Sequence, residues 1–356
     1  MYIKKVLLKN FRNYEEQEIN LNKNINIIYG NNAQGKTNII ESIFLCAYGK
    51  SFKAKKDNDL IKFGESYSKV EIEYEKIDRE GNIIAEINDK KTFFINGVKQ
   101  NKISDIIGKI NVVIFTPDDI DIIKEGPAKR RKFLDMMISS LKPNYLHLLN
   151  HYNKVLEQRN NYLRQIKTER KDSSLLDIWD EQLADFAFKI FEYRKMYIEK
   201  ISEIIKDIHN LITKSGKEEI SIKYISTGKS KESYLENLKK SRQIDIQRGF
   251  TGVGIHRDDF IISVNGKSVS IFGSQGQQRT AILTLKLCEM KIMKEELQDT
   301  PILLLDDFMS ELDEKRRTSF LENIKGSQVI ITCTDRIDLE NESNTFYVES
   351  GKCKKV

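Results

Sequence analysis

The chain of 356 residues carries 59 Lys or Arg against 53 Asp or Glu, a net charge of +6, and 39% of its residues are hydrophobic. This hydrophobic share excludes a disordered chain and suffices for a large core, in two domains or in one elaborated domain. No apolar run reaches the roughly 18 residues of a membrane helix, and the lysine-interrupted start lacks a signal-peptide core. Four scattered cysteines without a C-x-x-C pair fit a reduced protein of the cytoplasm, and we expect no membrane partner.

Residues 1–120 are predicted to form mainly strands. Runs rich in β-branched and aromatic residues are typical of strands. The predicted strands cover residues 6–11, 25–29, 70–74, 83–87 and 92–95. Asn96-Gly97 is a hairpin signal, and the apolar spacing of residues 38–48 predicts one helix among the strands.

Residues 121–245 are predicted to be helical. Apolar side chains recur at steps of three and four over residues 183–211, which predicts an amphipathic helix of about 35 residues from Asp177. A similar stripe over residues 145–163 marks a partner helix, with residues 171–174 as the connection. Two antiparallel helices with apolar stripes make a hairpin arm.

Residues 246–356 return to alternating strands and helices. Asn265-Gly266 is a second hairpin signal, between predicted strands at 260–264 and 269–272. The other predicted elements are a helix over 277–297, a strand over 302–305, a helix over 314–324 and a strand over 329–332. The pattern therefore predicts two α/β parts separated by a helical insertion.

A phosphate-binding loop is predicted between the strand at 25–29 and the helix at 38–48. The motif G-x-x-x-x-G-K-[ST] is matched by Gly30, Asn31, Asn32, Ala33, Gln34, Gly35, Lys36 and Thr37. The glycines let backbone N–H groups point at the phosphates of ATP, Lys36 supplies a cation for the β- and γ-phosphates, and Thr37 offers its hydroxyl to Mg²⁺. The N-terminus of the following helix favours the same negative charge.

A magnesium ion at such a loop needs a carboxylate, which the acidic pair after the strand at 302–305 supplies. Asp306 is predicted to hold Mg²⁺, and Asp307 to orient the attacking water. The alternative is that one of these carboxylates only caps the next helix. A guanine-reading [NT]-K-x-D motif is absent from the sequence, which argues against a GTPase.

A third motif consists of Ser274, Gln275, Gly276 and Gln277, at the start of a predicted helix. Alone it is weak, because most such loops are ordinary helix caps. It nevertheless resembles the Ser-Gly-Gln signature of ABC-class ATPases, which stands at the same place in the order of motifs and meets the γ-phosphate on a second subunit. This resemblance implies an ATP-sandwiched homodimer, with Ser310 and Asp313 in a loop that contacts the partner.

Together the motifs resemble those of the RecF family, related to the heads of SMC and Rad50 proteins, over the whole chain. The matching segments are residues 8–14, 30–37, 115–119, 127–135, 256–259, 274–279 and 303–313. The resemblance implies the fold class, an α/β, ABC-type (SMC/Rad50-like) P-loop ATPase head. Its two halves are expected at 1–120 and 246–356, and the inserted helical hairpin arm at 121–245.

The resemblance also implies a function. Members of this family are weak, DNA-stimulated ATPases that dimerise on ATP and bind single-stranded and gapped or junction DNA. With RecO and RecR they promote RecA loading in replication, gap repair and the SOS response. Arg12, in the first-strand motif, is implied to lie near the nucleotide. Asp307, shorter than the catalytic Glu usual in ABC ATPases, fits slow hydrolysis.

The positive charge is concentrated in one stretch. Residues 124–172 contain twelve Lys or Arg and five Asp or Glu, a net charge of +7, so the rest of the chain carries −1. Cations in the first turn of a helix oppose its dipole, which favours a binding role over a merely solvated face. The candidates for contacting DNA, or an acidic surface of a second subunit, are Lys129, Arg130, Arg131, Lys132, Arg159 and Arg164.

Two other classes of protein stay open at this point. A transporter-type ATPase subunit would not need the basic arm, and a nuclease of the same head family would need clustered metal-binding carboxylates. His256 has no metal-ligand companions at a usable spacing, so we expect it to have a structural, hydrogen-bonding role.

Overall fold

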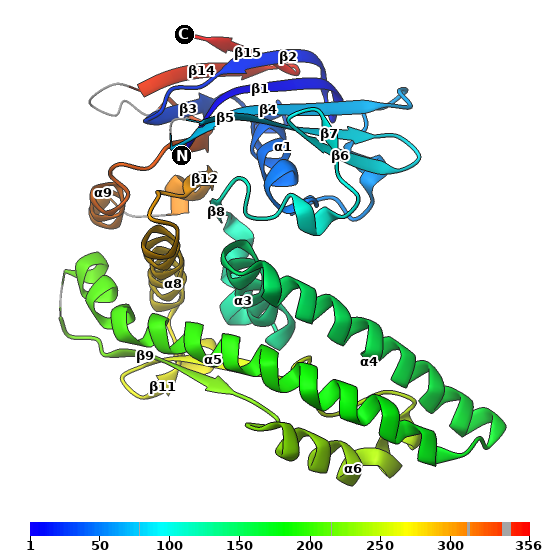
Figure 1. The fold of residues 1–356 in the computed structure, drawn as a ribbon. Helices are drawn as coiled ribbons and strands as arrows, with labels where there is room; N and C mark the ends of the chain where they lie inside the picture. Colours follow the sequence, from blue (N-terminus) through cyan, green and yellow to red (C-terminus); the bar gives the residue numbers. More distant parts are fainter. Residues whose placement is uncertain (78, 215, 312–313, 337–342) are drawn as a thin grey trace. The chain divides into compact units, whose positions relative to one another are not determined.

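The computed structural model describes residues 1–356 except 78, 215, 312–313 and 337–342. The chain forms two compact units (Figure 1). Unit 1 comprises Met1–Asp119 and Glu289–Val356, and unit 2 comprises Ile120–Cys288. Within the described ranges, no helix is long and apolar enough to cross a membrane.

One sheet of unit 1 is antiparallel, with six strands in the order β2-β1-β4-β5-β6-β7. Its strands are β1 (Tyr2–Phe11), β2 (Tyr14–Asn20), β4 (Ser68–Lys76), β5 (Arg79–Ile87), β6 (Lys91–Ile95) and β7 (Val98–Lys99). Along β4, buried Val70 and Ile72 alternate with more exposed charged residues. One face of this sheet therefore packs on the core. The predicted hairpin turn at Asn96-Gly97 joins β6 to β7, and both residues have the positive φ that this turn requires.

The second sheet of unit 1 runs in the order β15-β14-β3-β13-β12-β8. Its strands are β3 (Ile25–Tyr29), β8 (Val112–Phe115), β12 (Ile302–Asp306), β13 (Val329–Cys333), β14 (Ser343–Glu349) and β15 (Lys352–Lys355). Only β15 is antiparallel to its neighbour. Every residue of β8, β12 and β13 is buried, which explains why these strands are mostly apolar, apart from Asp306 and Thr332 near their ends. The β14–β15 hairpin was not among the predicted elements.

Helix α1 (Lys36–Tyr48) forms the centre of unit 1. It contacts β4 and β5 of the first sheet and β8, β12 and β13 of the second, and eleven of its thirteen residues are buried. Its burial fixes the loop that joins it to β3. The remaining elements of this part of the chain are η1 (Asp57–Leu60), η2 (Ile103–Asp105), η3 (Pro117–Ile120), η5 (Phe308–Glu311) and α9 (Glu314–Asn323).

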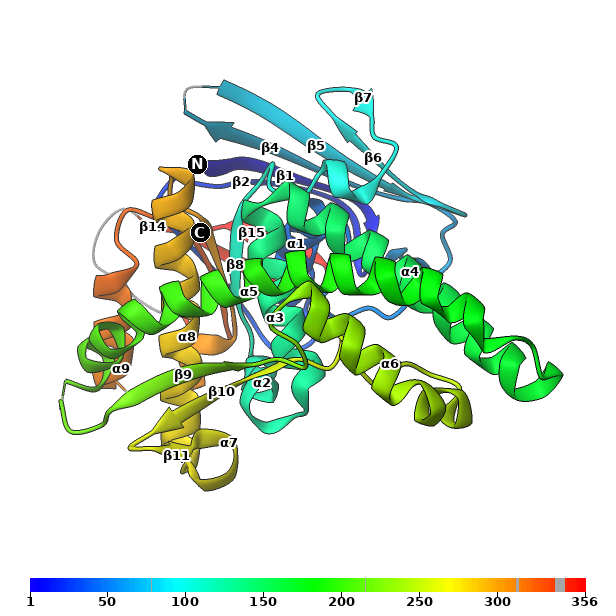
Figure 2. The same ribbon diagram turned by 60° about the horizontal axis from the view of Figure 1, so that its bottom comes forward.

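The predicted arm forms most of unit 2. Helices α4 (Pro143–Glu169) and α5 (Leu176–Thr213) lie side by side and antiparallel (Figures 1 and 2), which confirms the predicted hairpin. Helix α6 (Lys231–Arg248), which the sequence did not reveal, packs against both. The other elements are α2 (Asp121–Lys124), α3 (Pro127–Leu141), η4 (Ser173–Leu175), α7 (Val269–Phe272), α8 (Gln275–Leu297, which continues into unit 1) and the strands β9 (Ile220–Ile225), β10 (Asp259–Val264) and β11 (Lys267–Ser268).

Two details of unit 2 differ from the sequence prediction. The predicted strand at 269–272 is the short helix α7, whose turn is closed by a hydrogen bond from the Gly273 N–H to the Val269 carbonyl (3.1 Å). The second boundary between compact units falls after Cys288, whereas the predicted arm ended at residue 245. The reason is that β10 pairs with β9, so strands from both sides of residue 245 share one sheet.

A buried ionic cluster joins the three arm helices. Arg159 on α4 is completely buried, and its guanidinium donates to Asp180 on α5 (2.6 Å) and to Asp245 on α6 (2.9 Å). Arg242 donates to the second oxygen of Asp180 (2.6 Å). The prediction that Arg159 contacts DNA is therefore wrong, because its charge is enclosed and paired inside the arm.

Replacing Arg159 by Met should strongly destabilise the arm. The substitution leaves Asp245 buried without its cation, and breaking a buried pair costs on the order of 3–5 kcal/mol. For a unit of this size we expect the Tm to fall by roughly 10 °C. Lys240→Ala is the control, because Lys240 forms only an exposed pair with Glu236 and its loss should hardly change the Tm. Equal Tm values for the two variants would contradict the structural role of the cluster.

Candidate nucleotide site

The loop of residues 30–35 joins β3 to α1 in a conformation that depends on glycine. Gly30 has φ 151°, and a Cβ there would lie 2.3 Å from the Val348 carbonyl oxygen. Gly35 has φ 118° and directly precedes α1. The Lys36 ammonium is buried and donates to the carbonyls of Gly30 (2.8 Å) and Asn31 (2.9 Å). The loop thus curls around its own lysine, as a phosphate-binding loop must.

Two turns from distant parts of the sequence hold this loop. Asn13, between β1 and β2, donates from its side chain to the Gln34 carbonyl (2.7 Å). From the turn between β14 and β15, the Ser350 N–H donates to the Gln34 side chain (2.6 Å), and the Gly351 N–H donates to the Gln34 carbonyl (3.3 Å). Both hairpin turns therefore hold the loop through hydrogen bonds to Gln34. The sequence pattern had no signal for this contact, because the β14–β15 turn was not predicted.

The acidic pair lies beside the start of α1. The Thr37 hydroxyl donates to Asp306 Oδ1 over 2.8 Å, so the loop and the end of β12 meet as the motifs predicted. Asp306 is buried, and burial raises the pKa of its carboxyl above the ordinary value. A hydroxyl and a carboxylate in contact fit Mg²⁺, which takes one or two protein oxygens and completes its shell with phosphates and water.

A second hydroxyl, which sequence reasoning missed, organises both acids. Thr332, near the end of β13, donates to Asp306 Oδ1 (2.8 Å) and accepts from the Asp307 backbone N–H (3.0 Å). Asp307 has φ 48°, an uncommon conformation for a residue other than glycine. The sequence feature that could have indicated this role of Thr332 was its position near the end of a buried, mostly apolar strand.

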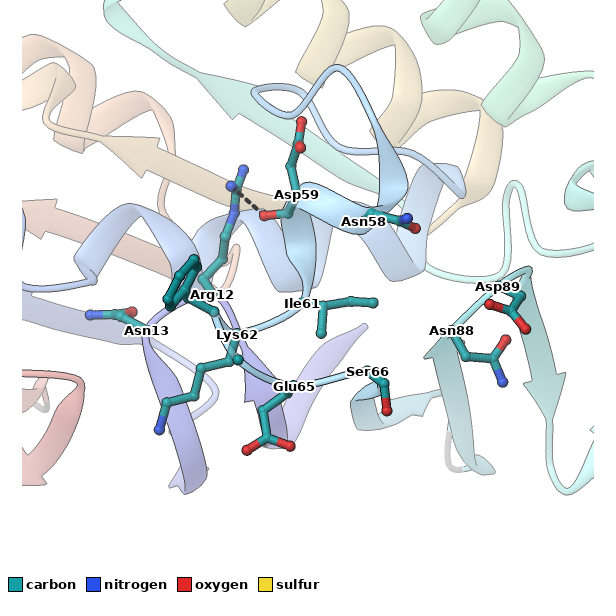
Figure 3. A pocket seen from close by; sticks show the side chains of 12 residues that line it. Arg12, Asn13, Asn58, Asp59, Ile61, Lys62, Glu65, Ser66, Asn88 and Asp89 are labelled. Carbon is teal, nitrogen blue, oxygen red and sulfur yellow. Dashed lines mark hydrogen bonds between the residues drawn. The ribbon is translucent and has the colours of Figure 1, made fainter.

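Arg12, in the turn between β1 and β2, contacts α1 at Glu41, four residues after Thr37. Its guanidinium donates two hydrogen bonds to the Glu41 carboxylate (2.8 and 2.7 Å), and these bonds raise the pKa of Arg12. It also donates to the Asp59 carbonyl (2.7 Å), as Figure 3 shows. Arg12 and Asn13 line a cavity of about 790 Å³. The other residues that line it are Asn58, Asp59, Ile61, Lys62, Phe63, Gly64, Glu65, Ser66, Asn88 and Asp89.

The signature-like motif lies in unit 2, at the start of α8. The Ser274 N–H donates to the Gln277 side chain (3.0 Å), and the Gln277 N–H donates to the Ser274 hydroxyl (3.2 Å). These reciprocal bonds cap the helix. Ser274 and Gln275 are exposed. Of the predicted partner-contacting loop, Asp313 and the side chain of Ser310 lie outside the described residues.

Most of the basic cluster at the start of α3 is engaged within unit 2. Lys129 forms an ion pair with Asp121 (3.0 Å). Arg130 donates two hydrogen bonds to the Asp259 carboxylate (2.6 and 3.0 Å). Arg131 donates to the Asp258 carbonyl (2.8 Å). These contacts explain why cations occupy a helix N-terminus in spite of the dipole.

Two other cations among the candidates, Lys132 and Arg164, are exposed. Arg164 donates to the Asn161 side chain (2.9 Å).

His256 has the structural role that the sequence predicted. Its Nε2 lies 3.0 Å from the Thr251 carbonyl, and its Nδ1 lies 2.6 Å from the Tyr152 hydroxyl. Burial lowers its pKa to about 4, so the ring is neutral at physiological pH. The Nε2 hydrogen is donated to Thr251, and Tyr152 donates to Nδ1. Across the described residues, no group of three or more His, Cys, Asp or Glu side chains is arranged to hold a metal ion.

Comparison with known proteins agrees with this geometry. The family model for the RecF/RecN/SMC N terminal domain matches residues 2–355. A Clostridium acetobutylicum protein named DNA replication and repair protein RecF is 46% identical over 99% of both chains, and the Clostridium tetani protein of the same name is 44% identical over 99% of both. A structure of the recombination mediator RecF with ATP, in the RecFOR pathway, superimposes with a TM-score of 0.94 at 39% identity, covering 100% of this chain and 97% of the other.

The fold and the site define an ATPase head of the ABC type, in the SMC class. An SMC head bound to a winged-helix domain of ScpA shares this fold, with a TM-score of 0.60 at 19% identity over 100% of this chain and 97% of that one. Within this class, the chain belongs to the RecF family.

Replacing Thr332 by Val should slow ATP turnover without weakening ATP binding. The substitution keeps the shape but removes the hydroxyl that holds Asp306 and Asp307, and loss of a hydrogen bond to a charged group predicts a fall in kcat of roughly tenfold or more. The KM for ATP should change little, because the loop and Lys36 are untouched. Thr332→Ser restores the hydroxyl and should restore most of kcat in a steady-state ATPase assay. A fully active Val variant would remove Thr332 from the site.

Proposed function

We propose that this protein is an ATP-dependent, DNA-binding recombination mediator. It acts in DNA replication, gap repair and SOS induction, binds single-stranded and gapped or junction DNA, and dimerises on ATP. It is a weak, DNA-stimulated ATPase that works mainly as a switch, and with RecO and RecR it helps to load RecA. Its relatives are named for DNA replication and repair, and the ATP-bound structure is described as belonging to the RecFOR pathway.

The observation that carries the proposal is the contact between Thr37 and Asp306. It brings the phosphate-binding loop and the acidic strand to one point, beside the buried end of α1. Thr37 and Asp306 would hold Mg²⁺, which supplies charge for the phosphates when it is bound. Lys36 balances the negative charge of the phosphates, and Asp307 orients the attacking water.

The cavity beside Arg12 is suited to bind the base and ribose of ATP. Asn13 both lines this cavity and donates to the Gln34 carbonyl of the phosphate loop, so the two sites adjoin. Polar side chains along its wall, among them those of Asn58, Ser66 and Asn88, provide hydrogen-bonding groups. Glu41 already balances the charge of Arg12, which suits contact with a base or a ribose better than with a phosphate.

ATP should bring two copies of the chain together through the Ser274 loop. Lys36→Ala removes the cation for the phosphates, and Ser274→Arg puts a bulky charge where the γ-phosphate of the other subunit would lie. We expect neither variant to elute as a dimer from a gel-filtration column equilibrated with ATP, whereas the parent does. Thr168→Arg, at the exposed end of α4, is the control for added charge and should dimerise normally. A normal dimer of Ser274→Arg would refute the sandwich.

The exposed cations at the end of α4 are the favoured DNA contacts. Arg164, Lys167 and Arg170 are all exposed there. Removing Arg164 and Lys167 together should make the slope of log affinity against log salt shallower by up to about 1.8 on duplex DNA. The measurement is a titration of gapped duplex with the ATP-bound protein at several salt concentrations, together with the DNA stimulation of ATP turnover. Lys240→Ala, in an exposed pair, is the control. An unchanged slope would exclude this end of the arm from the interface.

A further inference from the structure

The signature loop is tied to a carboxylate that no motif predicted. The Gln277 side chain accepts the Ser274 N–H through its oxygen and donates through its nitrogen to Glu218 Oε1 over 2.7 Å. Glu218 stands in the connection between α5 and β9, 59 residues earlier in the chain. One amide group therefore spans from the loop to this connection, and Glu218 fixes its orientation.

A buried histidine in turn fixes Glu218. His209, near the end of α5, is completely buried, and its Nε2 lies 3.2 Å from Glu218 Oε2. Its Nδ1 lies 3.1 Å from the hydroxyl of Thr284 on α8. The Thr284 hydroxyl donates its own hydrogen to the Thr280 carbonyl (2.8 Å), so it can only accept from Nδ1. With Nδ1 carrying a hydrogen and a carboxylate facing Nε2, a proton lies between Nε2 and Glu218.

The neighbouring carboxylate provides a contrast. Glu219 has a side chain that is 70% exposed and pairs with Lys206, whereas the Glu218 side chain is only 26% exposed. Two successive acids thus point in different directions, one to the surface and one to the signature loop. A charge that served only solubility would not need a buried histidine behind it.

We propose that Glu218, held by His209, is a positioning residue for the signature loop. It keeps the Gln277 amide in the orientation that fixes the Ser274 backbone, and so sets where the Ser274 hydroxyl points relative to the γ-phosphate on a second subunit. This inference rests on the proposed function of the loop. Because His209 belongs to α5, the same bonds join the longest helix of the arm to the signature.

The test compares Glu218→Ala, Glu218→Gln and Glu219→Ala. Glu218→Ala removes the acceptor for Gln277, and we expect kcat for ATP to fall about tenfold while the KM stays within about twofold, because each subunit binds ATP through its own phosphate loop. Glu218→Gln can still accept from Gln277 through its oxygen and donate to a neutral His209 ring through its nitrogen, so it should recover most of kcat. Glu219→Ala should behave like the parent.

Hydrogen exchange separates this inference from the proposed function. The Ser274 N–H is bonded to the Gln277 side chain, so its exchange rate reports the position of that amide without ATP or a second subunit. We expect exchange about tenfold faster in Glu218→Ala than in Glu219→Ala. Equal exchange in these two variants, or a Gln variant as slow in turnover as the Ala variant, would overturn the inference. Failure of the parent protein to hydrolyse ATP or to dimerise would instead count against the proposed function alone.

Discussion

The organisation of unit 1 depends on the burial of one helix between two sheets. Helix α1 contacts strands of both sheets and exposes almost none of its surface, so its N-terminus cannot move without disturbing the core. The phosphate-binding loop precedes that N-terminus, and the acidic pair ends a strand that packs on the same helix. The short bond from Thr37 to Asp306 is therefore a consequence of core packing, which sets the positions of these two polar groups.

The same constraint explains why the loop needs support from both ends of the chain. A loop whose glycines adopt positive φ has few intrinsic preferences, and its conformation is fixed by what contacts it. The β1–β2 turn and the β14–β15 turn both bond to Gln34, and Gly351 is itself constrained, because a Cβ there would lie 2.4 Å from the Asn13 carbonyl oxygen. Residues near the two termini thus meet at the phosphate loop.

How much the sequence could predict follows from how local each signal is. The loop of residues 30–37, the two acids after β12 and the long arm helices have motifs or periodicities that lie within a few dozen residues. The structure brings Thr37 to Asp306 and packs α4 against α5. Thr332 and the β14–β15 turn act through contacts between distant segments, which no local pattern contains. Arg159 lay within reach of sequence reasoning, because it occupies the apolar stripe of α4 with Tyr152, Val155, Leu163 and Ile166. A charged residue in such a stripe predicts a buried pair, and here its partners are on other helices.

Counting charges along the sequence overestimates the positive charge that the arm exposes. The excess of +7 belongs to residues 124–172, but the carboxylates that neutralise Arg130 and Arg159 are Asp259, Asp180 and Asp245, all outside that stretch. The excess that reaches the surface is therefore smaller than the count suggests. Lys124, Lys132 and Lys154 are exposed singly, whereas Arg164, Lys167, Arg170 and Lys171 are exposed together near the end of α4. Paired, partly buried cations serve to hold α3 and the strand at 259–264 together, whereas only exposed cations can exchange their counterions for phosphates. The candidate DNA surface consequently moves from the base of the arm toward its far end.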